Sequence, residues 1–240
     1  MRFTNGYWLL RDEMTPAYAV EYAGHTVKGD ELVVYLPGKH IAGRGDALNI
    51  PMLTVTLSTP MEGVIKVSAV HHAGALYKGP FAEIKNDHPH AEITETEDCL
   101  TFASGSLKAV IHKTPNAYKL AFYEGEKFLT ESSFRNLAHM HNRETGKNYM
   151  VEQLLIDVDE YVYGLGERFT PFVKNGQTVE MWNEDGGTAS EIAYKNIPFY
   201  ITNKGYGVLV DNEGDVAYEI ASEKVERIQF TERSPNETTK

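Results

Sequence analysis

Residues 31–36 read ELVVYL and residues 52–58 read MLTVTLS, and these two stretches decide the fold class. In the second stretch, Leu53, Val55 and Leu57 alternate with polar Thr and Ser. This period of two is typical of a strand that buries one face in a core. Similar short runs recur along the chain, separated by Gly, Pro, Asn or Asp, which favour turns. The pattern predicts many short strands that pack as an antiparallel sandwich.

The remaining candidate strands are rich in Val, Ile, Thr and aromatic residues. They are Gly63–Val70, Ala91–Glu95, Cys99–Ala103, Ser106–His112, Tyr118–Tyr123, Lys127–Thr130, Met150–Val158, Tyr161–Tyr163, Thr178–Trp182, Phe199–Thr202, Gly207–Val210, Val216–Ile220 and Val225–Phe230. No 12-residue window carries the apolar stripe of an amphipathic helix, and the best short candidate is Ala189–Tyr194. We therefore predict an all-β fold, a large antiparallel β-sandwich with little helix, as a single domain over residues 1–240.

Three stretches resist assignment to regular strands: Gly38–Pro51, Phe134–Asn148 and Pro171–Asn196. The third is the longest, and one short candidate strand interrupts it. Long irregular connections in a compact domain are usually functional or disordered. Because this stretch carries Trp182 and several Tyr and Phe residues, we expect a functional loop.

The charge balance and the single cysteine limit the possible partners and location. The chain has 23 Lys and Arg against 34 Asp and Glu, a formal net charge of −11, which argues against a nucleic-acid partner. No run of 18 apolar residues could span a membrane, and residues 1–14 lack the apolar core of a secretory signal. Cys99 cannot form an internal disulfide, so a reducing cytoplasm is the simplest location. We expect Cys99 to be a buried structural residue.

Histidines occur in three close pairs, at residues 71–72, 88–90 and 139–141. On a strand, such a pair could chelate a transition metal. No third ligand accompanies the pairs at a metal-binding spacing, so we expect surface or loop histidines, with no metal and no cofactor.

Two further clusters receive a structural interpretation. The acidic residues Asp157, Asp159 and Glu160 are interpreted as a solvated strand edge. Gly164 and Gly166 are followed by no helix pattern, which argues against a phosphate-binding loop. The two glycines instead predict a tight corner that needs positive φ angles or a close backbone approach.

The segment WNEDGGT, residues 182–188, lies in the middle of the longest irregular stretch. Sugar sites commonly combine a carboxylate that accepts from hydroxyls with an aromatic face that contacts the C–H side of the ring. Asp185, close to Trp182, is therefore a candidate sugar ligand. The alternative is an Asx-turn, in which the Asp185 carboxylate accepts only from its own following backbone.

Five motifs follow one another in a fixed order in the second half of the chain. They are YGLGERF at 163–169, NGQT at 175–178, WNEDGGT at 182–188, YKNIPFY at 194–200 and GYGVLV at 205–210. This ordered series closely resembles family 31 of the glycoside hydrolases, specifically its bacterial α-xylosidase branch with its α-glucosidase relatives. The resemblance is dense from about Asn148 to Phe230 and thinner toward the N-terminus.

The resemblance implies an N-terminal β-sandwich of the galactose-mutarotase-like type, a supersandwich, followed by a catalytic (β/α)₈ barrel. A barrel needs about 250 residues of its own, so we expect it after residue 240, together with the aspartate nucleophile and the aspartate acid/base. The isolated chain is then inactive and holds no catalytic residue. The parent would be a retaining α-xylosidase or α-glucosidase, whose partner is an α-xyloside or α-glucoside oligosaccharide.

In this family a long loop of the N-terminal domain reaches over the barrel mouth and helps to wall the substrate pocket. The resemblance implies that Asp185 contacts the substrate from this loop, with Trp182, Asn183 and Thr188 as further candidates. Relatives commonly have Arg where this chain has Glu184, which alters the local charge.

Within the YGLGERF motif, Glu167 and Arg168 are expected to hold the corner together by pairing. Two other functions stay open. A stand-alone carbohydrate-binding β-sandwich would favour an aromatic platform on an exposed sheet face, whereas Tyr and Phe here alternate as core residues. An aldose epimerase needs His and Glu converging over one sheet, whereas the nine histidines lie mostly in turns or at strand ends. The choice between xylosides and glucosides and a homo-oligomeric parent also stay open.

Overall fold

The computed structural model describes residues 2–5, 9–71, 89–184, 193–212 and 214–233. Within these ranges the chain forms eighteen strands and one short 3₁₀ helix, η1 (Arg44–Ala47). The strands of each sheet pair antiparallel to their neighbours. The prediction of an all-β antiparallel sandwich is confirmed. No helix in the described ranges is long and apolar enough to cross a membrane.

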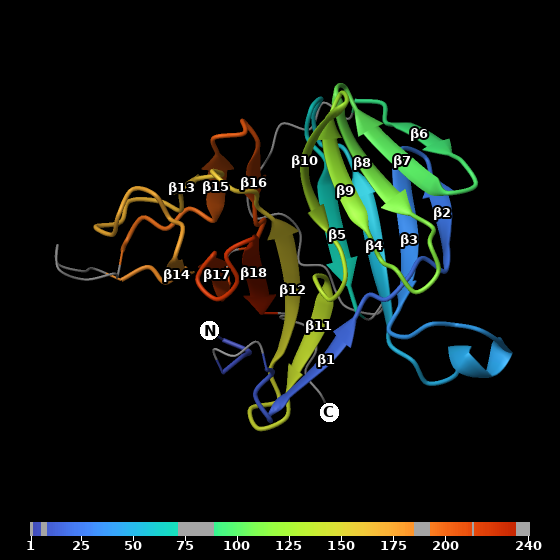
Figure 1. Ribbon diagram of the computed structural model, residues 1–240, viewed down its shortest axis with the longest axis horizontal. Helices are drawn as coiled ribbons and strands as arrows, with labels where there is room; N and C mark the ends of the chain where they lie inside the picture. Colours follow the sequence, from blue (N-terminus) through green and yellow to red (C-terminus); the bar gives the residue numbers. More distant parts are fainter. Residues whose placement is uncertain (1, 6–8, 72–88, 185–192, 213, 234–240) are drawn as a thin grey trace.

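Two sheets form the right-hand part of the molecule in Figure 1. The first has the order β2 (Gly24–Lys28), β3 (Glu31–Pro37), β4 (Met52–Ser58) and β5 (Lys66–Val70). The second has the order β10 (Lys127–Ser132), β9 (Leu120–Glu124), β8 (Leu107–His112), β7 (Cys99–Ser104) and β6 (Glu92–Glu95).

The alternation in β4 decides which side chains enter the core between these sheets. Leu53, Val55 and Leu57 are buried there together with Leu100 and Phe102 of β7. Each such burial stabilises the fold by about 1.5–3 kcal/mol. A one-residue slip would bring the polar residues of β4 into the core, so the register is strongly specified.

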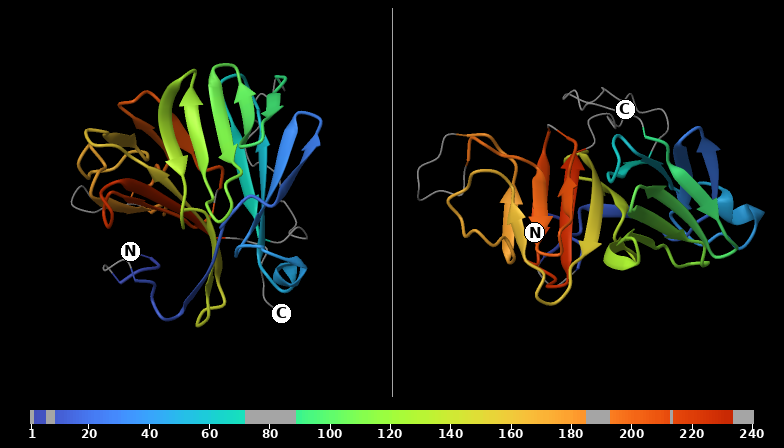
Figure 2. Two further views of the ribbon diagram at one scale, coloured as in Figure 1. Left: turned by 45° about the vertical axis from the view of Figure 1, so that its right-hand side comes forward. Right: turned by 90° about the horizontal axis from the view of Figure 1, so that it is seen from above.

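A six-stranded sheet continues the molecule to the left. Its order is β1 (Met14–Tyr18), β11 (Ala138–Asn142), β12 (Asn148–Leu155), β18 (Arg227–Arg233), β17 (Val216–Ile220) and β14 (Gln177–Glu180). A three-stranded sheet has the order β13 (Val162–Gly164), β15 (Phe199–Thr202) and β16 (Gly207–Leu209). Figure 2 shows β12, β18 and β17 between the two-sheet sandwich and the connections of residues 165–176, 181–184 and 193–198.

A second core joins the three-stranded sheet to the six-stranded sheet. Val162 and Tyr200 are buried there with Tyr218, Ile220 and Ile228 of the six-stranded sheet. The rings of Tyr200 and Tyr218 meet edge to face, with their centroids 6.3 Å apart. This core holds in place β13, β14 and β15, the strands that the two long connections join.

Most predicted strands are observed within one to three residues of their expected bounds, and β4, β15 and β17 match them. Three strands, β1, β2 and β11, are missing from the prediction. β11 lies in the unassigned stretch Phe134–Asn148, and its sequence AHMHN contains no β-branched residue. The helical candidate Ala189–Tyr194 lies mostly outside the described residues.

The prediction of a solvated acidic edge is wrong for Glu160. Its side chain is fully buried, and its Oε2 lies 3.1 Å from Lys204 Nζ. The same oxygen accepts from the backbone N–H of Asp157 at 2.9 Å. Ion pairing and hydrogen bonding offset the cost of removing the carboxylate from water. Sequence alone cannot show this partner, which is 44 residues away.

The predictions for His139 and Cys99 are also wrong. His139 is only 7% exposed, and its ring stacks on that of His71 with the centroids 4.0 Å apart. It is a residue of the interior, not of a loop or surface. Cys99 is half-buried, and its sulfur lies 3.3 Å from the Thr96 hydroxyl.

Candidate functional site

The predicted sugar-contacting loop begins after β14 and ends at β15. β14 divides the irregular stretch predicted at Pro171–Asn196, and the connection that carries the loop runs from residue 181 to residue 198. We name residues 181–184 and 193–197 the neck of this loop.

Two of the four predicted substrate-binding residues lie in the neck. Trp182 and Asn183 belong to its first stem. Asp185 and Thr188 lie outside the described residues. The structure therefore describes the base on which the candidate sugar ligand Asp185 is carried.

The Asn196 side chain holds the two stems of the neck together. The two hydrogens of its Nδ2 are shared among three acceptors: the backbone oxygen of Trp182 at 2.8 Å, Asn183 Oδ1 at 2.8 Å and the backbone oxygen of Ala193 at 2.7 Å. The backbone N–H of Glu184 donates to the same Ala193 oxygen at 3.1 Å. Backbone groups of one stem thus find partners on the other.

Asn183 contributes its side chain to this arrangement. Its Oδ1 accepts from the Asn196 backbone N–H at 3.2 Å as well as from Nδ2, and Asn183 forms an isolated parallel bridge with Ala193. The Asn183 side-chain oxygen therefore stabilises the neck, while its predicted contact with substrate stays a prediction.

Arg168 connects the neck to the rest of the domain. Its guanidinium donates to Asn196 Oδ1 and to the backbone oxygen of Glu180 at 2.8 Å, and its Nε donates to the backbone oxygen of Leu165 at 3.2 Å. Next to it, Lys195 Nζ pairs with Glu167 at 3.1 Å. Glu167 and Arg168 both hold the corner, each through partners on another segment.

The corner itself packs on the second stem. Gly164, Leu165 and Gly166 have φ angles of +109°, +65° and +86°. A Cβ on Gly166 would lie 2.0 Å from the backbone oxygen of Lys195. The backbone N–H of Glu167 donates to that same oxygen at 3.0 Å. The predicted tight corner with positive φ and a close backbone approach is confirmed, and it packs on the second stem of the neck.

Trp182 offers an exposed aromatic surface at the start of the loop. Its side chain is 68% exposed, and its indole N–H donates to Glu184 Oε2 at 2.9 Å. Glu184 thereby orients the indole. Such a ring can contact the C–H side of a sugar.

A buried lysine, Lys174, lies on the connection between the corner and β14. Lys174 is buried, and its Nζ donates to the Pro171 backbone oxygen at 2.8 Å and to Thr170 Oγ1 at 3.1 Å. Burial lowers the pKa of Lys174, and the positive charge of Arg168 adds to this effect. The contacts of Lys174 lie within its own segment, whereas Arg168 reaches the neck through Asn196.

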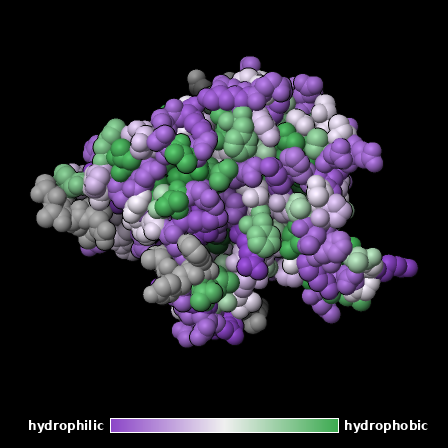
Figure 3. Space-filling model, viewed as in Figure 1, coloured by the Kyte–Doolittle hydropathy of each residue, from purple (hydrophilic) through white to green (hydrophobic). Residues whose placement is uncertain are grey.

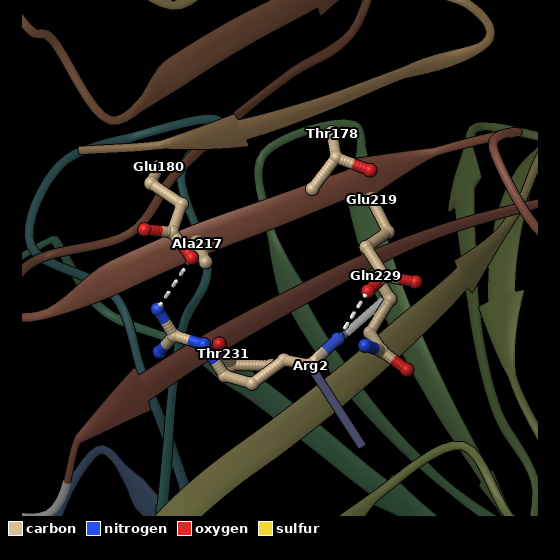
Figure 4. A pocket seen from close by; sticks show the side chains of 7 residues that line it. All are labelled: Arg2, Thr178, Glu180, Ala217, Glu219, Gln229 and Thr231. Atoms are coloured by element: carbon tan, nitrogen blue, oxygen red, sulfur yellow. Dashed lines mark hydrogen bonds and ion pairs between the residues drawn. The ribbon is translucent and has the colours of Figure 1, made fainter. Parts of the chain in front are cut away.

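A small polar cavity lies on the face of the six-stranded sheet that is opposite to the second core (Figure 4). It is lined by Arg2, Thr178, Glu180, Ala217, Glu219, Gln229 and Thr231. The Arg2 guanidinium crosses the cavity to Glu180 at 3.3 Å and to Asp215 at 2.9 Å. The cavity has a volume of about 100 Å³, which holds a few water molecules and is below the roughly 300–1,000 Å³ of small-molecule sites. We therefore do not assign the sugar site to it.

Metal-ligating groups do not gather at the neck. Among the residues that the structure describes, no cluster of three His, Cys, Asp or Glu side chains could hold a metal ion. His72 and His88, members of two of the histidine pairs, lie outside those residues.

A sequence profile described as the glycosyl hydrolase 31 N-terminal galactose mutarotase-like domain matches residues 54–219. The chain belongs to this family. It is 43% identical over 231 residues to the α-xylosidase XylQ of Lactiplantibacillus pentosus, a match that covers 96% of the chain and 30% of the relative. It is 40% identical over 250 residues to an α-xylosidase of Emericella nidulans, covering 96% of the chain and 32% of the relative.

Solved structures show the same fold for this family 31 N-terminal domain. The cycloalternan-forming enzyme from Listeria monocytogenes superposes with a TM-score of 0.75 at 16% identity, over 95% of this chain and 20% of that one. A family 31 α-xylosidase from a soil metagenome superposes with a TM-score of 0.65 at 18% identity, over 88% and 31%. The domain spans about a third of the length of the two α-xylosidases that it matches in sequence.

Sequence reasoning missed the role of Asn196, and it expected Arg168 to pair within the corner but missed its contacts with Asn196 and Glu180. Asn196 is part of the YKNIPFY motif, and Arg168 is part of YGLGERF. A signal was present, because an Asn before Ile-Pro and an Arg after two glycines both lie where chain direction changes. Their common partner could be found only in three dimensions.

Proposed function

We propose that this chain is the N-terminal domain of a retaining α-glycosidase that hydrolyses α-xylosides or α-glucosides. In this proposal a catalytic (β/α)₈ barrel follows residue 240 and supplies both catalytic carboxylates, and the parent enzyme is cytoplasmic. The loop of residues 181–198 forms part of the wall of the sugar pocket. Retaining hydrolysis needs two carboxyl groups about 5–5.5 Å apart on opposite sides of the scissile bond. Neighbouring Glu184 and Asp185 on one loop are poorly placed for that role.

One observation carries the proposal for the loop. The neck is closed by Asn196, Asn183 and Arg168, which join both stems to the corner and to the six-stranded sheet. A connection that served only to link β14 to β15 would not need this base. The identities with two α-xylosidases support the xyloside class, and dextranase and cycloalternan-forming enzymes among the structural relatives support oligosaccharides in general.

The test is Asp185→Ala in the parent enzyme, assayed on aryl α-xylosides and α-glucosides. Loss of a charge-assisted hydrogen bond to a hydroxyl costs roughly 1.5–3 kcal/mol, so kcat/KM should fall about 10- to 150-fold. The free energy of unfolding should change by less than about 1 kcal/mol, because a pocket-facing carboxylate supports little of the core. Asp211→Ala, on the connection after β16, is the control and should leave kcat/KM unchanged.

The Asx-turn alternative gives the opposite result. An unchanged kcat/KM with a clear fall in melting temperature would assign Asp185 a structural role in its loop. Turnover by the isolated 240-residue chain would overturn the domain assignment itself.

A stand-alone carbohydrate-binding module is the second candidate, favoured by the exposed rings of Trp182 and Tyr194. It requires that the isolated chain bind an α-xyloside oligosaccharide at millimolar or lower concentration, and that Trp182→Ala abolish this binding. Titration calorimetry on the 240-residue chain decides between the two. Absence of binding by the isolated chain, with activity in the longer polypeptide, favours the domain assignment.

A further inference from the structure

The three-stranded sheet carries apolar side chains on both of its faces. Tyr200 of β15 is fully buried in the second core, whereas its neighbours Phe199 and Ile201 point to the opposite face and are 40% and 44% exposed. The register places Leu209 opposite Phe199 and Tyr163 opposite Ile201. These residues share the outward face of the sheet.

A fifth side chain extends this surface. The Phe172 ring is 77% exposed and lies 5.2 Å from the Tyr163 ring, centroid to centroid. We name the set Tyr163, Phe172, Phe199, Ile201 and Leu209 the β15 face. Figure 3 shows hydrophobic residues gathered over this part of the molecule, at the left of the view.

The composition of the β15 face differs from that of an ordinary solvated sheet. In β4, the outward positions include Thr54, Thr56 and Ser58, as expected for a strand with one wet face. On β13, β15 and β16 the outward positions hold no charged residue, in a chain with a net charge of −11. Contiguous exposed apolar surface marks an interaction site, and interface centres are poor in charge and rich in aromatic residues.

We propose that the β15 face is the docking surface for the catalytic domain that follows residue 240 in the parent polypeptide. This inference rests on the proposed function. The chain spans only 30% and 32% of the two α-xylosidases that it matches, so most of the length of such a protein lies outside it. A domain of that size has the surface to cover a five-residue apolar face.

Continuity with the loop favours the same occupant. The second stem of the neck leads directly into β15, and the Leu165 N–H of the corner donates to the Phe199 backbone oxygen at 2.8 Å. A domain whose sugar pocket is walled by the loop lies next to the neck, and therefore next to the β15 face. The interface is then a contiguous strip from the neck to β16.

The test compares one double variant in the 240-residue chain and in the parent polypeptide. Ile201→Thr with Leu209→Thr makes the face polar while it keeps high strand propensity. In the 240-residue chain, where we expect the face to be in water, the melting temperature should change by less than about 2 °C. In the parent polypeptide it should fall by at least about 5 °C, or one unfolding transition should split into two.

Val67→Thr with Val70→Thr is the matched control. Both valines lie on the edge strand β5 and are 36% exposed, so exposed apolar side chains are again replaced by Thr, here on another sheet. This control should leave the melting temperature unchanged in both contexts. Limited proteolysis should cleave between the domains faster in the Ile201/Leu209 variant only.

Each other outcome overturns the docking proposal. Equal melting temperatures of variant and wild type in the parent would show that the β15 face stays in water. A wild-type 240-residue chain that sediments as a dimer, and that Ile201→Thr with Leu209→Thr converts to a monomer, would assign the face to a second copy. Failure of the proposed function is separate: a parent without α-glycosidase activity can still show the context-dependent loss of stability.

Discussion

Replacing Gly166 with Ala tests whether the corner supports the loop, because a closely matched control exists ten residues away. Gly166 and Gly176 have nearly the same backbone angle, with φ of +86° and +85°. A Cβ on Gly166 would meet the Lys195 oxygen at 2.0 Å and the Ile197 nitrogen at 2.8 Å, whereas a Cβ on Gly176 would meet nothing within 4 Å. The two substitutions thus share the conformational cost and differ in the contact with the neck.

The expected magnitudes follow from these geometries. An L side chain in the left-handed region costs about 1–2 kcal/mol, which Gly176→Ala should show alone. Gly166→Ala adds an overpacking cost of about 2–3 kcal/mol, because the obstructing atoms belong to backbone that cannot rotate away. For a chain of this size the difference corresponds to a gap in melting temperature of roughly 4–12 °C.

Thermal and urea unfolding of the two variants measure this gap. Hydrogen exchange at the Glu167 amide, which donates to the Lys195 oxygen at 3.0 Å, should accelerate in Gly166→Ala and stay unchanged in Gly176→Ala. Equal destabilisation by the two substitutions would refute the reasoning, because the corner would then not bear on the second stem of the neck.

Two further outcomes are expected. Asn196→Ala should lower the free energy of unfolding by about 2–3 kcal/mol and speed proteolytic cleavage of the loop. Asn196→Asp keeps an acceptor for Arg168 but loses the donors, so it should behave in the same way; wild-type resistance of either variant would contradict the clamp. Burial raises the pKa of Glu152 from 4.5 to about 7, against the opposing effects of Ser132 and the Gln153 N–H. The native state therefore keeps this proton after the unfolded chain has lost it, so stability should fall by about 3 kcal/mol as the pH rises from 4.5 to 7. Glu152→Gln should remove that slope in urea titrations, and an unchanged slope would show that Glu152 is not its source.

The fold class was predictable because alternation is a local property of the chain. In β4, each Leu or Val at an odd position is buried and each intervening residue is partly exposed. The same rule failed for β11, where Ala138, His139 and Met140 are all buried in succession. A strand covered on both faces has no alternation to detect, and a buried His is indistinguishable from a surface His in sequence.

The buried pair of Glu160 and Lys204 shows a second limit. Glu160 precedes β13 and Lys204 lies in the turn between β15 and β16, so the pairing of these strands brings them together. Each residue alone is typical of solvent-exposed positions. Only the register of the sheet decides that the charge is inside, and register is a property of the assembled fold.

The candidate site also has one part that sequence could predict and one part that only the structure shows. Asp185 was a candidate from its position near Trp182, and the resemblance between motifs favoured it over the ordinary structural explanation, an Asx-turn. The neck is a physical finding of a different kind: Gly166 and Arg168 belong to one segment and Asn196 to another, and their contacts are specific to one arrangement. A rigid base matters for a ligand-binding loop because the ordering cost is then met in folding and does not weaken binding. If the neck has this role, Asn196→Ala in the parent should reduce kcat/KM in the same direction as Asp185→Ala, but with a loss of stability that Asp185→Ala lacks.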